Sequence, residues 1–189
     1  MGTIRRRSGP GNPGSPAGMR RAAGALAALA LATGAAVAQP APSFPGGAQS
    51  VSEAFQDWQV ACTLPQGTKR CVISQQQLDS RSRQRVLAVE LQPRGEKVEG
   101  VLFLPFGLFL EKGVALKLGE ADLAALRFST CLPQGCVVPL SFDARALAQL
   151  RKADALRVNA ATDTGQVQPF TISLKGFGPA LDRAAALLK

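Results

Sequence analysis

The sequence predicts an all-β protein, an antiparallel β-sandwich or barrel-like sheet, with two short packing helices, one of them C-terminal, and two local disulfides. Three observations support this prediction. Most of the chain after residue 53 consists of short β-branched or aromatic segments bounded by Gly or Pro. Two segments instead carry apolar residues at helical spacing. The four cysteines form two close pairs, and each pair flanks a turn sequence.

The first 38 residues predict a signal peptide that is removed on export. Two arginines at 20–21 precede an apolar stretch, and Ala-Val-Ala at 36–38 has the small-x-small pattern of a cleavage site. The apolar stretch spans about 15 residues, fewer than the roughly 20 that a membrane-spanning helix needs. Met19, which two arginines follow, is a more typical start than Met1, so residues 1–18 are interpreted as an upstream extension.

Cleavage would leave residues 39–189. Residues 39–52, which include PAPSFPGG, predict a flexible linker, and residues 53–189 predict a single domain. The removed segment contains five of the 22 Lys and Arg and none of the 13 Asp and Glu, so the mature chain has 17 basic and 13 acidic residues, a net charge of +4. This charge does not indicate a nucleic-acid partner.

Nine strands are predicted in the domain. In the first of them, Trp58, Val60 and Cys62 share one face, so we expect Trp58 to pack in the core rather than to bind a ligand. The apolar run GVLFLPFGLFL at 100–110 favours a strand covered on both faces; if one side is exposed, it becomes a contact for protein or lipid. The strands are expected at 58–63, 71–76, 86–92, 100–104, 114–118, 125–130, 136–142, 156–160 and 170–174.

Two helices are predicted after the seventh and the ninth strand. Asp143 is a typical N-cap for a helix in DARALAQLRKAD, and Pro179 occupies the first turn of a C-terminal helix in GPALDRAAALLK. Both helices carry an apolar stripe that favours packing against a sheet. The stripes consist of Ala146, Leu147 and Leu150, and of Leu181, Ala184, Ala185 and Leu188.

The four cysteines predict structural cross-links. Three pairings are possible, and the local one, Cys62 with Cys71 and Cys131 with Cys136, is favoured because Leu-Pro-Gln-Gly reverses the chain inside each pair. The short loops support about 2–3 kcal/mol of stabilisation per bridge. Direct pairing of Cys131 with Cys136 would turn apolar residues of 125–130 away from the apolar face of 136–142, so we expect a bulge or a shifted register in this hairpin.

Two functional alternatives exist for the same cysteines. Cys131 and Cys136 could form the redox site of a thiol-disulfide oxidoreductase, although such sites typically use C-x-x-C at a helix N-terminus. All four cysteines could bind zinc, although gaps of eight and four residues match the usual ligand spacing poorly. The chain has no His and no Tyr, which excludes Ser-His-Asp and Cys-His catalysis and His-ligated metal or haem sites. We therefore predict no catalytic residue, no metal site and no cofactor.

A run of arginines is the strongest candidate for contact with a partner. The run SRSRQR contains Arg81, Arg83 and Arg85. If the strand that follows also included this run, the three arginines would lie on its core face. We therefore place them on a loop or hairpin end. We expect them near Lys69 and Arg70, where the group could bind phosphates or carboxylates. The simpler alternative is a solvated turn.

Five ordered motifs resemble a known family. FQDWQVAC at 55–62, the cysteine at 71, the Pro-x-Gly of LPFGLFLEKGVALKLG, FSTCLPQGC and SLKGF at 173–177 together resemble the invasion-associated locus B family of bacterial envelope proteins. The resemblance spans residues 55–177, and only Gln56 departs from it, in place of an expected small residue. It implies an exported all-β protein without enzyme activity, linked in some host-associated bacteria to entry into host cells.

We therefore expect a non-catalytic exported protein that is periplasmic, associated with the outer membrane or secreted. It would bind an unidentified protein or envelope component, in an oligomeric state that the sequence leaves open. Peripheral membrane association is compatible with the sequence, but no transmembrane segment is expected. The alternatives are an oxidoreductase that uses Cys131 and Cys136, and an anion-binding module that uses Arg81, Arg83 and Arg85.

Overall fold

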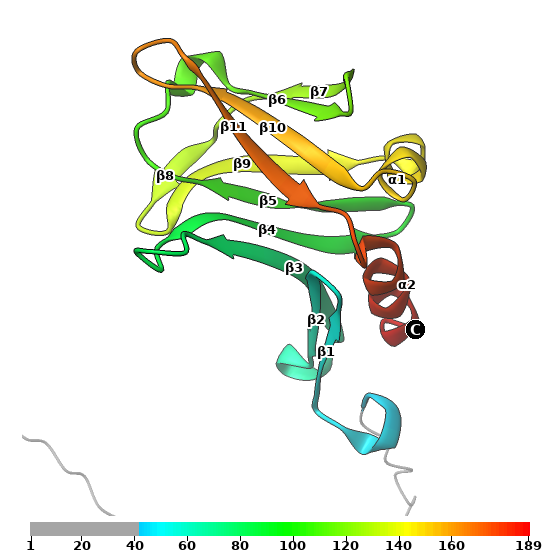
Figure 1. The fold of residues 1–189 in the computed structure, drawn as a ribbon. Coiled ribbons are helices and arrows are strands. Elements are labelled where there is room, and N and C mark those ends of the chain that lie inside the picture. Colours follow the sequence, from blue (N-terminus) through cyan, green and yellow to red (C-terminus); the bar gives the residue numbers. More distant parts are fainter. Residues whose placement is uncertain (1–41) are drawn as a thin grey trace, which may run out of the picture. The chain divides into compact units, whose positions relative to one another are not determined.

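A computed structural model of the protein describes residues 42–189, so the predicted signal peptide and its cleavage site lie outside the described residues. Within this range the chain forms two antiparallel sheets and two α-helices (Figure 1). The larger sheet has seven strands in the order β1-β2-β3-β4-β5-β9-β8, and the smaller has four in the order β11-β10-β6-β7. The predicted all-β architecture with a C-terminal helix is confirmed.

The larger sheet consists of β1 (Ser50–Phe55), β2 (Trp58–Thr63), β3 (Arg70–Leu78), β4 (Arg85–Arg94), β5 (Lys97–Leu104), β8 (Thr130–Leu132) and β9 (Gly135–Phe142). The smaller sheet consists of β6 (Val114–Leu118), β7 (Ala121–Leu126), β10 (Ala155–Ala161) and β11 (Val167–Ser173). The helices are α1 (Ala144–Leu150) and α2 (Phe177–Leu187), and short 3-10 turns occur at η1 (Pro45–Gly47), η2 (Pro65–Gly67) and η3 (Leu110–Lys112). Asp143 caps α1 as predicted, because its carboxylate accepts a hydrogen bond of 2.8 Å from the N–H of Ala146.

The strand predicted at 125–130 is wrong. Residues up to Leu126 belong to β7 in the smaller sheet, and the chain then crosses to the larger sheet, where β8 begins at Thr130. The apolar alternation through this segment therefore belongs to two different sheets. The bulge or shifted register expected in this hairpin is therefore wrong: Cys131 pairs directly with Cys136 in a regular β8–β9 register, because the apolar residues that conflicted with this pairing belong to β7 in the other sheet.

The linker predicted at 39–52 extends too far into the chain. Phe44 is buried in the core, with the Lys69 ammonium 5.7 Å from its ring centroid, and β1 begins at Ser50. The Pro and Gly residues that suggested a linker instead form the single turn η1. The ordered domain therefore includes residues before 53.

Both sheets and α2 share one hydrophobic core. On β2, Trp58, Val60 and Cys62 are buried and the alternate residues are exposed, as the sequence predicted. The edge of the Trp58 ring meets Phe177 of α2 with the ring centroids 5.2 Å apart. Burial of side chains of this size contributes about 1.5–3 kcal/mol each, so this contact holds the C-terminal helix firmly on the first strands.

Side-chain amides close the outer edge of β11. The N–H of Ser173 donates to Oε1 of Gln75 at 3.1 Å, and its carbonyl accepts from Nε2 of Gln75 at 3.0 Å and from Nε1 of Trp58 at 2.9 Å. Gln75 thus pairs with Ser173 as a neighbouring strand would. It is 6% exposed and is the one buried polar or charged residue in the described range. This interaction joins the smaller sheet to β2 and β3 of the larger one.

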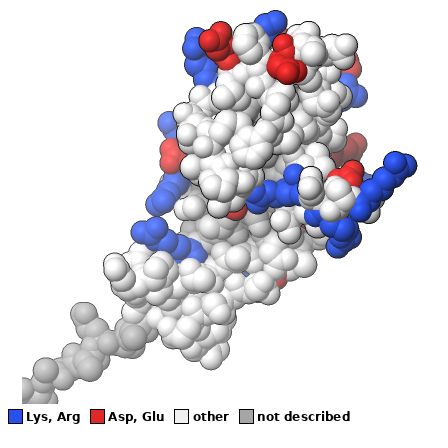
Figure 2. Space-filling model, turned by 90° about the vertical axis from the view of Figure 1, so that its left-hand side faces the viewer, with Lys and Arg blue, Asp and Glu red and all other residues white. Residues whose placement is uncertain are grey.

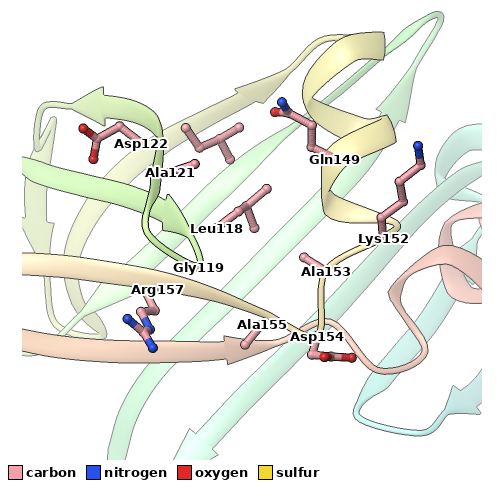
Figure 3. Close-up of a pocket in the computed structure, with 11 residues that line it drawn as sticks. Leu118, Gly119, Ala121, Asp122, Gln149, Lys152, Ala153, Asp154, Ala155 and Arg157 are labelled. Carbon is pink, nitrogen blue, oxygen red and sulfur yellow. The ribbon is translucent and has the colours of Figure 1, made fainter.

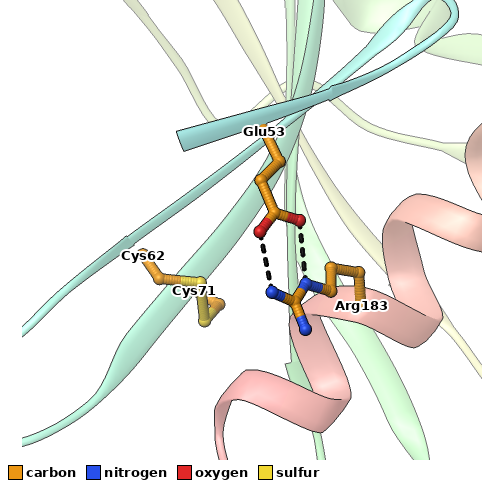
Figure 4. Close-up of a disulfide and its surroundings, with 4 residues drawn as sticks. All are labelled: Glu53, Cys62, Cys71 and Arg183. Carbon is orange, nitrogen blue, oxygen red and sulfur yellow. Dashed lines mark hydrogen bonds and ion pairs between the residues drawn. A yellow bond between two sulfur atoms is a disulfide. The ribbon is translucent and has the colours of Figure 1, made fainter. Parts of the chain in front are cut away.

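Figure 4 shows a disulfide on β2 and β3 and an ion pair between β1 and α2. Cys62 and Cys71 are register partners on β2 and β3 and are bonded to each other. Glu53 of β1 accepts two hydrogen bonds from Arg183 of α2, at 2.7 and 2.8 Å. The hydrogen bonds from Arg183 hold the pKa of the Glu53 carboxyl below its usual value. The pair therefore ties the edge strand to the terminal helix only while Glu53 is ionised.

Replacement of Gln75 by Leu should lower the free energy of unfolding by about 1–3 kcal/mol, because it leaves the partly buried backbone N–H of Ser173 without its acceptor. Urea denaturation measures the change. Gln76→Leu is the matched control: Gln76 is the exposed neighbour on β3, and a substitution there should stay within about 0.5 kcal/mol. Equal stability of the two variants would show that the amide does not close the edge of β11.

The ion pair predicts a pH dependence. Because the folded-state pKa of Glu53 is lowered, its stabilisation is fully present above the unfolded pKa, about 4.3, and is lost as the pH falls through the folded value. Glu53→Gln should therefore be less stable than the wild type at pH 7, with a difference that shrinks below about pH 4.3. Arg183→Gln should show the same dependence on pH. Thermal unfolding between about pH 3 and pH 7 measures the stability of both variants relative to the wild type. A stability difference that does not change with pH would contradict the ion pair between Glu53 and Arg183.

Candidate functional site

The antiparallel strand order gathers four loops at one end of the sandwich. These are the segments 79–84 after β3, 105–113 after β5, 133–134 after β8 and 162–166 after β10. We call this surface the loop end. Both helices follow strands that run away from it, so they lie at the opposite end (Figure 1).

A carboxylate organises the arginine loop at the loop end. Oδ1 of Asp79 accepts hydrogen bonds from the N–H groups of Ser82 at 2.7 Å and Arg81 at 3.0 Å. Hydrogen bonds from the N–H and hydroxyl of Ser82, and from the N–H of Arg81, lower the pKa of the Asp79 carboxyl. Arg83 adopts a left-handed backbone with φ 57°. Because the loop's own carboxylate is occupied by these donors, the side chains of Arg81 and Arg83 are left exposed to solvent.

The third arginine is held closer to the sheet. Arg85 begins β4, its guanidinium donates a hydrogen bond to the carbonyl of Gln134, and it lies 5.5 Å from the centroid of the Phe103 ring. Arg85 thus connects the arginine loop with the β8–β9 turn. The three arginines lie together at the loop end, on a loop and a strand end, as predicted.

Lys69 and Arg70 do not join them, so that part of the prediction is wrong. Arg70 begins β3 and the arginine loop follows the last residue of the same nine-residue strand. A strand of this length separates its ends by about 26 Å. Sequence parity indicates which face a residue occupies, but it carries no information on which end of the strand a loop lies at.

The loop end also carries all six large hydrophobic side chains that are exposed in the described part of the chain. Phe106 is 62% exposed and Val167 is 68% exposed. The run at 100–110 is thus only partly core: Leu102 and Leu104 are buried, but the aromatic ring that follows them points into solvent, so the expected cover on both faces is wrong. The six are Leu78, Phe106, Phe109, Leu110, Leu132 and Val167.

Figure 2 looks onto this end of the molecule. A broad uncharged area covers its middle, and Lys and Arg side chains border that area together with Asp and Glu side chains. A groove of about 680 Å³ runs between the arginine loop and the β8–β9 turn, with Arg83, Arg85, Phe106 and Pro133 in its lining. Charged and apolar groups therefore meet in one hollow.

Phe106 and its apolar neighbours were not predicted as surface residues. A usable signal was present, because Pro105 and Gly107 flank Phe106 and predict a turn there. Side chains at the apex of a turn lie outside a sheet and are commonly exposed.

Ion pairing differs between the two ends. Of the four ion pairs in residues 42–189, none involves an arginine at 81, 83 or 85. The pairs instead connect residues on the helices, on β1 and near the β6–β7 turn, which lies at the helix end. They are Lys117 with Asp122, Arg151 with Asp182, Arg157 with Glu120, and Arg183 with Glu53.

A second hollow lies at the helix end, between the β6–β7 hairpin and the segment that joins α1 to β10 (Figure 3). It measures about 560 Å³, and Leu118, Ala121 and Ala153 contribute apolar surface. Two of the charged residues around it, Asp122 and Arg157, are already bound in ion pairs with Lys117 and Glu120. The other two charged residues of its lining, Lys152 and Asp154, have opposite charges, so this hollow lacks the excess of positive charge that the arginine loop has.

The residues of the first and last sequence motifs meet at the junction around Ser173. The hydroxyl of Ser173 donates to Asp57 at 2.5 Å and accepts from the N–H of Lys175 at 3.3 Å. Gly176 has φ 84°, and a Cβ there would lie 2.0 Å from the carbonyl oxygen of Phe55. These contacts fix the chain before α2, so the motifs build the fold and do not assemble a cleft for chemistry.

Both disulfides have the predicted local pairing, and the described residues contain no free cysteine. Cys131 and Cys136 lie on β8 and β9 rather than at a helix N-terminus, which does not favour the oxidoreductase. Zinc coordination by four thiolates is incompatible with two disulfides. Within residues 42–189 no group of three or more metal-ligating side chains is placed to hold a metal.

The two disulfides should differ in their reactivity toward reductant. Cys62 and Cys71 are both buried, whereas Cys131 is exposed at the loop end. Under native conditions a thiol reductant should open the bridge between Cys131 and Cys136 first, because attack requires access to a sulfur. Alkylation of the released thiols followed by peptide mass spectrometry identifies the order. Earlier release of Cys62 and Cys71 would contradict the burial described here.

Comparisons with known proteins agree with the fold and the motifs. The family described as "Invasion associated locus B (IalB) protein" matches residues 58–185. An "Invasion protein B homolog" of Brucella abortus (strain 2308) is 48% identical over 151 residues, which cover 79% of this chain and 87% of the relative. The "Invasion protein B" of Bartonella bacilliformis is 31% identical over 152 residues, which cover 78% and 81%.

A solved structure supports the same assignment. The crystal structure of invasion associated protein B from Bartonella henselae superposes with a TM-score of 0.68 at 29% sequence identity, and covers 73% of this chain and 97% of that one. The family match extends from the start of β2 into α2, and thus includes both disulfides and Trp58, Gln75 and Ser173 of the junction. The chain belongs to the invasion associated locus B family.

Proposed function

We propose that this chain is an exported, non-catalytic protein of the bacterial envelope that binds its partner through the loop end. One observation carries the proposal: every exposed large hydrophobic side chain of the described residues lies at that end, next to arginines without acidic partners. Exposed apolar side chains that cluster beside charges are typical of interaction surfaces. The anion-binding alternative becomes part of this surface, because Arg81, Arg83 and Arg85 border it.

Export is supported by the N-terminal sequence and by the cysteines. The Arg-Arg, apolar and Ala-Val-Ala pattern before residue 39 favours cleavage there, which would leave one mature domain. Both cysteine pairs are oxidised, as is usual in the periplasm and outside the cell. No helix among residues 42–189 has the length and apolar character to cross a membrane. The relatives named invasion proteins support a role in contact with a host cell.

A non-catalytic role is supported by the chemistry of the side chains. The chain has no His, and its sulfurs are bound in disulfides. The Ser173 hydroxyl, which sequence spacing alone could suggest as a nucleophile beside Lys175, is engaged with Asp57 and the backbone at a structural junction. Binding is therefore the function that this surface supports best.

The proposal predicts that loop-end substitutions abolish binding to the envelope without unfolding the protein. Mature protein, residues 39–189, should sediment with envelopes isolated from its own bacterium. Phe106→Ser with Leu132→Ser should weaken this binding at least about ten-fold, because both side chains are exposed and would lose buried apolar area in the complex. Their exposure also means that the melting temperature should change little.

A helix-end variant provides the control. Arg145→Gln with Lys152→Gln alters two exposed residues at the opposite end, and should bind the envelopes like the wild type. Full binding by the loop-end variant, or loss of binding by the helix-end variant, would contradict the proposed function.

A further inference from the structure

We propose that the loop end docks on an anionic membrane surface, where its arginines bind lipid phosphates and its apolar side chains enter the boundary between headgroups and acyl chains. The inference rests on the proposed function and specifies the partner. It follows from three properties of the loop end: the arrangement of its apolar side chains, the internal pairing of its backbone and the placement of its charges.

The apolar side chains come from separate loops that point in the same direction. Leu78 precedes the arginine loop, Phe106 and Phe109 lie in segment 105–113, and Leu132 precedes the β8–β9 turn. Val167 follows the β10–β11 turn. Side chains that project from several loops at one end can enter a membrane boundary together, and each adds apolar area that leaves water.

The backbone of these loops is paired within the loops themselves. In the arginine loop, the N–H of Asp79 donates to Gln84 at 2.8 Å, and the N–H of Arg83 donates to Asp79 at 2.9 Å. Segment 105–113 and the β10–β11 turn show the same pattern: the N–H of Lys112 donates to the carbonyl of Phe109 at 3.2 Å, and the N–H of Thr162 donates to the carbonyl of Gln166 at 2.8 Å. Unpaired backbone groups are costly near hydrocarbon, so loops that satisfy their own N–H groups suit a lipid boundary.

The charges of the loop end favour anionic lipids. Arg81 and Arg83 are exposed, and neither takes part in an ion pair. Arginine binds phosphate through two parallel hydrogen bonds. Its long aliphatic stem allows the guanidinium to stay among the headgroups while the apolar side chains of the loop end lie deeper in the membrane. The acidic residues Glu111 and Asp163 lie on other loops of the loop end, and the carboxylate of Asp79 is bound by N–H groups of the arginine loop. The arginine loop is therefore the side of the loop end that meets the headgroups.

Vesicle binding tests the charge requirement. Mature protein should bind vesicles of phosphatidylglycerol and phosphatidylethanolamine, and should bind phosphatidylcholine vesicles much more weakly. Added salt should release it from the anionic vesicles. Inorganic phosphate should release no more protein than another salt at the same ionic strength. Arg81→Gln with Arg83→Asn should weaken binding about 25-fold, about five-fold per charge. Asn is chosen at residue 83 because it tolerates the positive φ. Arg145→Gln with Lys152→Gln removes the same net charge from the helix end and should change binding less than about two-fold.

Fluorescence tests insertion directly. The chain has one Trp, and it is 2% exposed, so its emission should not respond to vesicles. Phe106→Trp adds an exposed indole whose emission should shift to shorter wavelength with anionic vesicles and be quenched by brominated acyl chains. Arg145→Trp, at the helix end, should show neither effect. Bound protein in which the Trp at 106 stays unshifted and unquenched would overturn the inference.

The two proposals can fail separately. If loop-end substitutions abolish binding to envelopes but the wild type does not bind anionic vesicles, the membrane inference is wrong and the proposed function stands. If both two-charge variants lose vesicle binding equally, attraction depends on net charge rather than on this surface, and the inference is also wrong. Loss of envelope binding only in the helix-end variant would overturn both proposals.

Discussion

The architecture depends on how the outer edge of β11 is closed. An edge strand exposes backbone N–H and C=O groups that invite pairing with another chain. Here Gln75 and Trp58, from two strands of the larger sheet, bind the N–H and carbonyl of Ser173. The same serine binds Asp57 through its hydroxyl. One residue thus joins the two sheets and fixes where the C-terminal helix begins.

The charged side chains have different roles at the two ends of the molecule. Two of the four ion pairs of the described residues, Arg151 with Asp182 and Arg183 with Glu53, include a residue of α2, and the other two lie near the β6–β7 turn, so charges at that end stabilise the fold. At the loop end the disulfide between Cys131 and Cys136 fixes a turn, and Asp79 fixes the arginine loop. The arginine and apolar side chains there extend from a rigid frame, which lowers the entropy that binding must overcome.

The sequence predicts the elements whose pattern is local. β2 and β6 have the predicted bounds because their alternation is complete, and the disulfides follow from two turn sequences. β1 was missed because half of SVSEAF is polar and its burial is only partial. The departure at Gln56 also becomes clear: φ is 53° in this two-residue hairpin turn, a conformation that favours smaller residues. The positions of Arg70 and Phe106 relative to the arginine loop depend on strand direction and loop shape, which periodicity does not encode.

The central claim is that the Ser173 junction holds the fold while the loop end performs the binding. The most direct test measures stability and membrane binding on the same variant, Ser173→Ala. The account predicts a free energy of unfolding lower by about 1–2 kcal/mol, because the hydroxyl bond to Asp57 is lost, with unchanged affinity of the folded protein for anionic vesicles. Unchanged stability together with lost binding would contradict it.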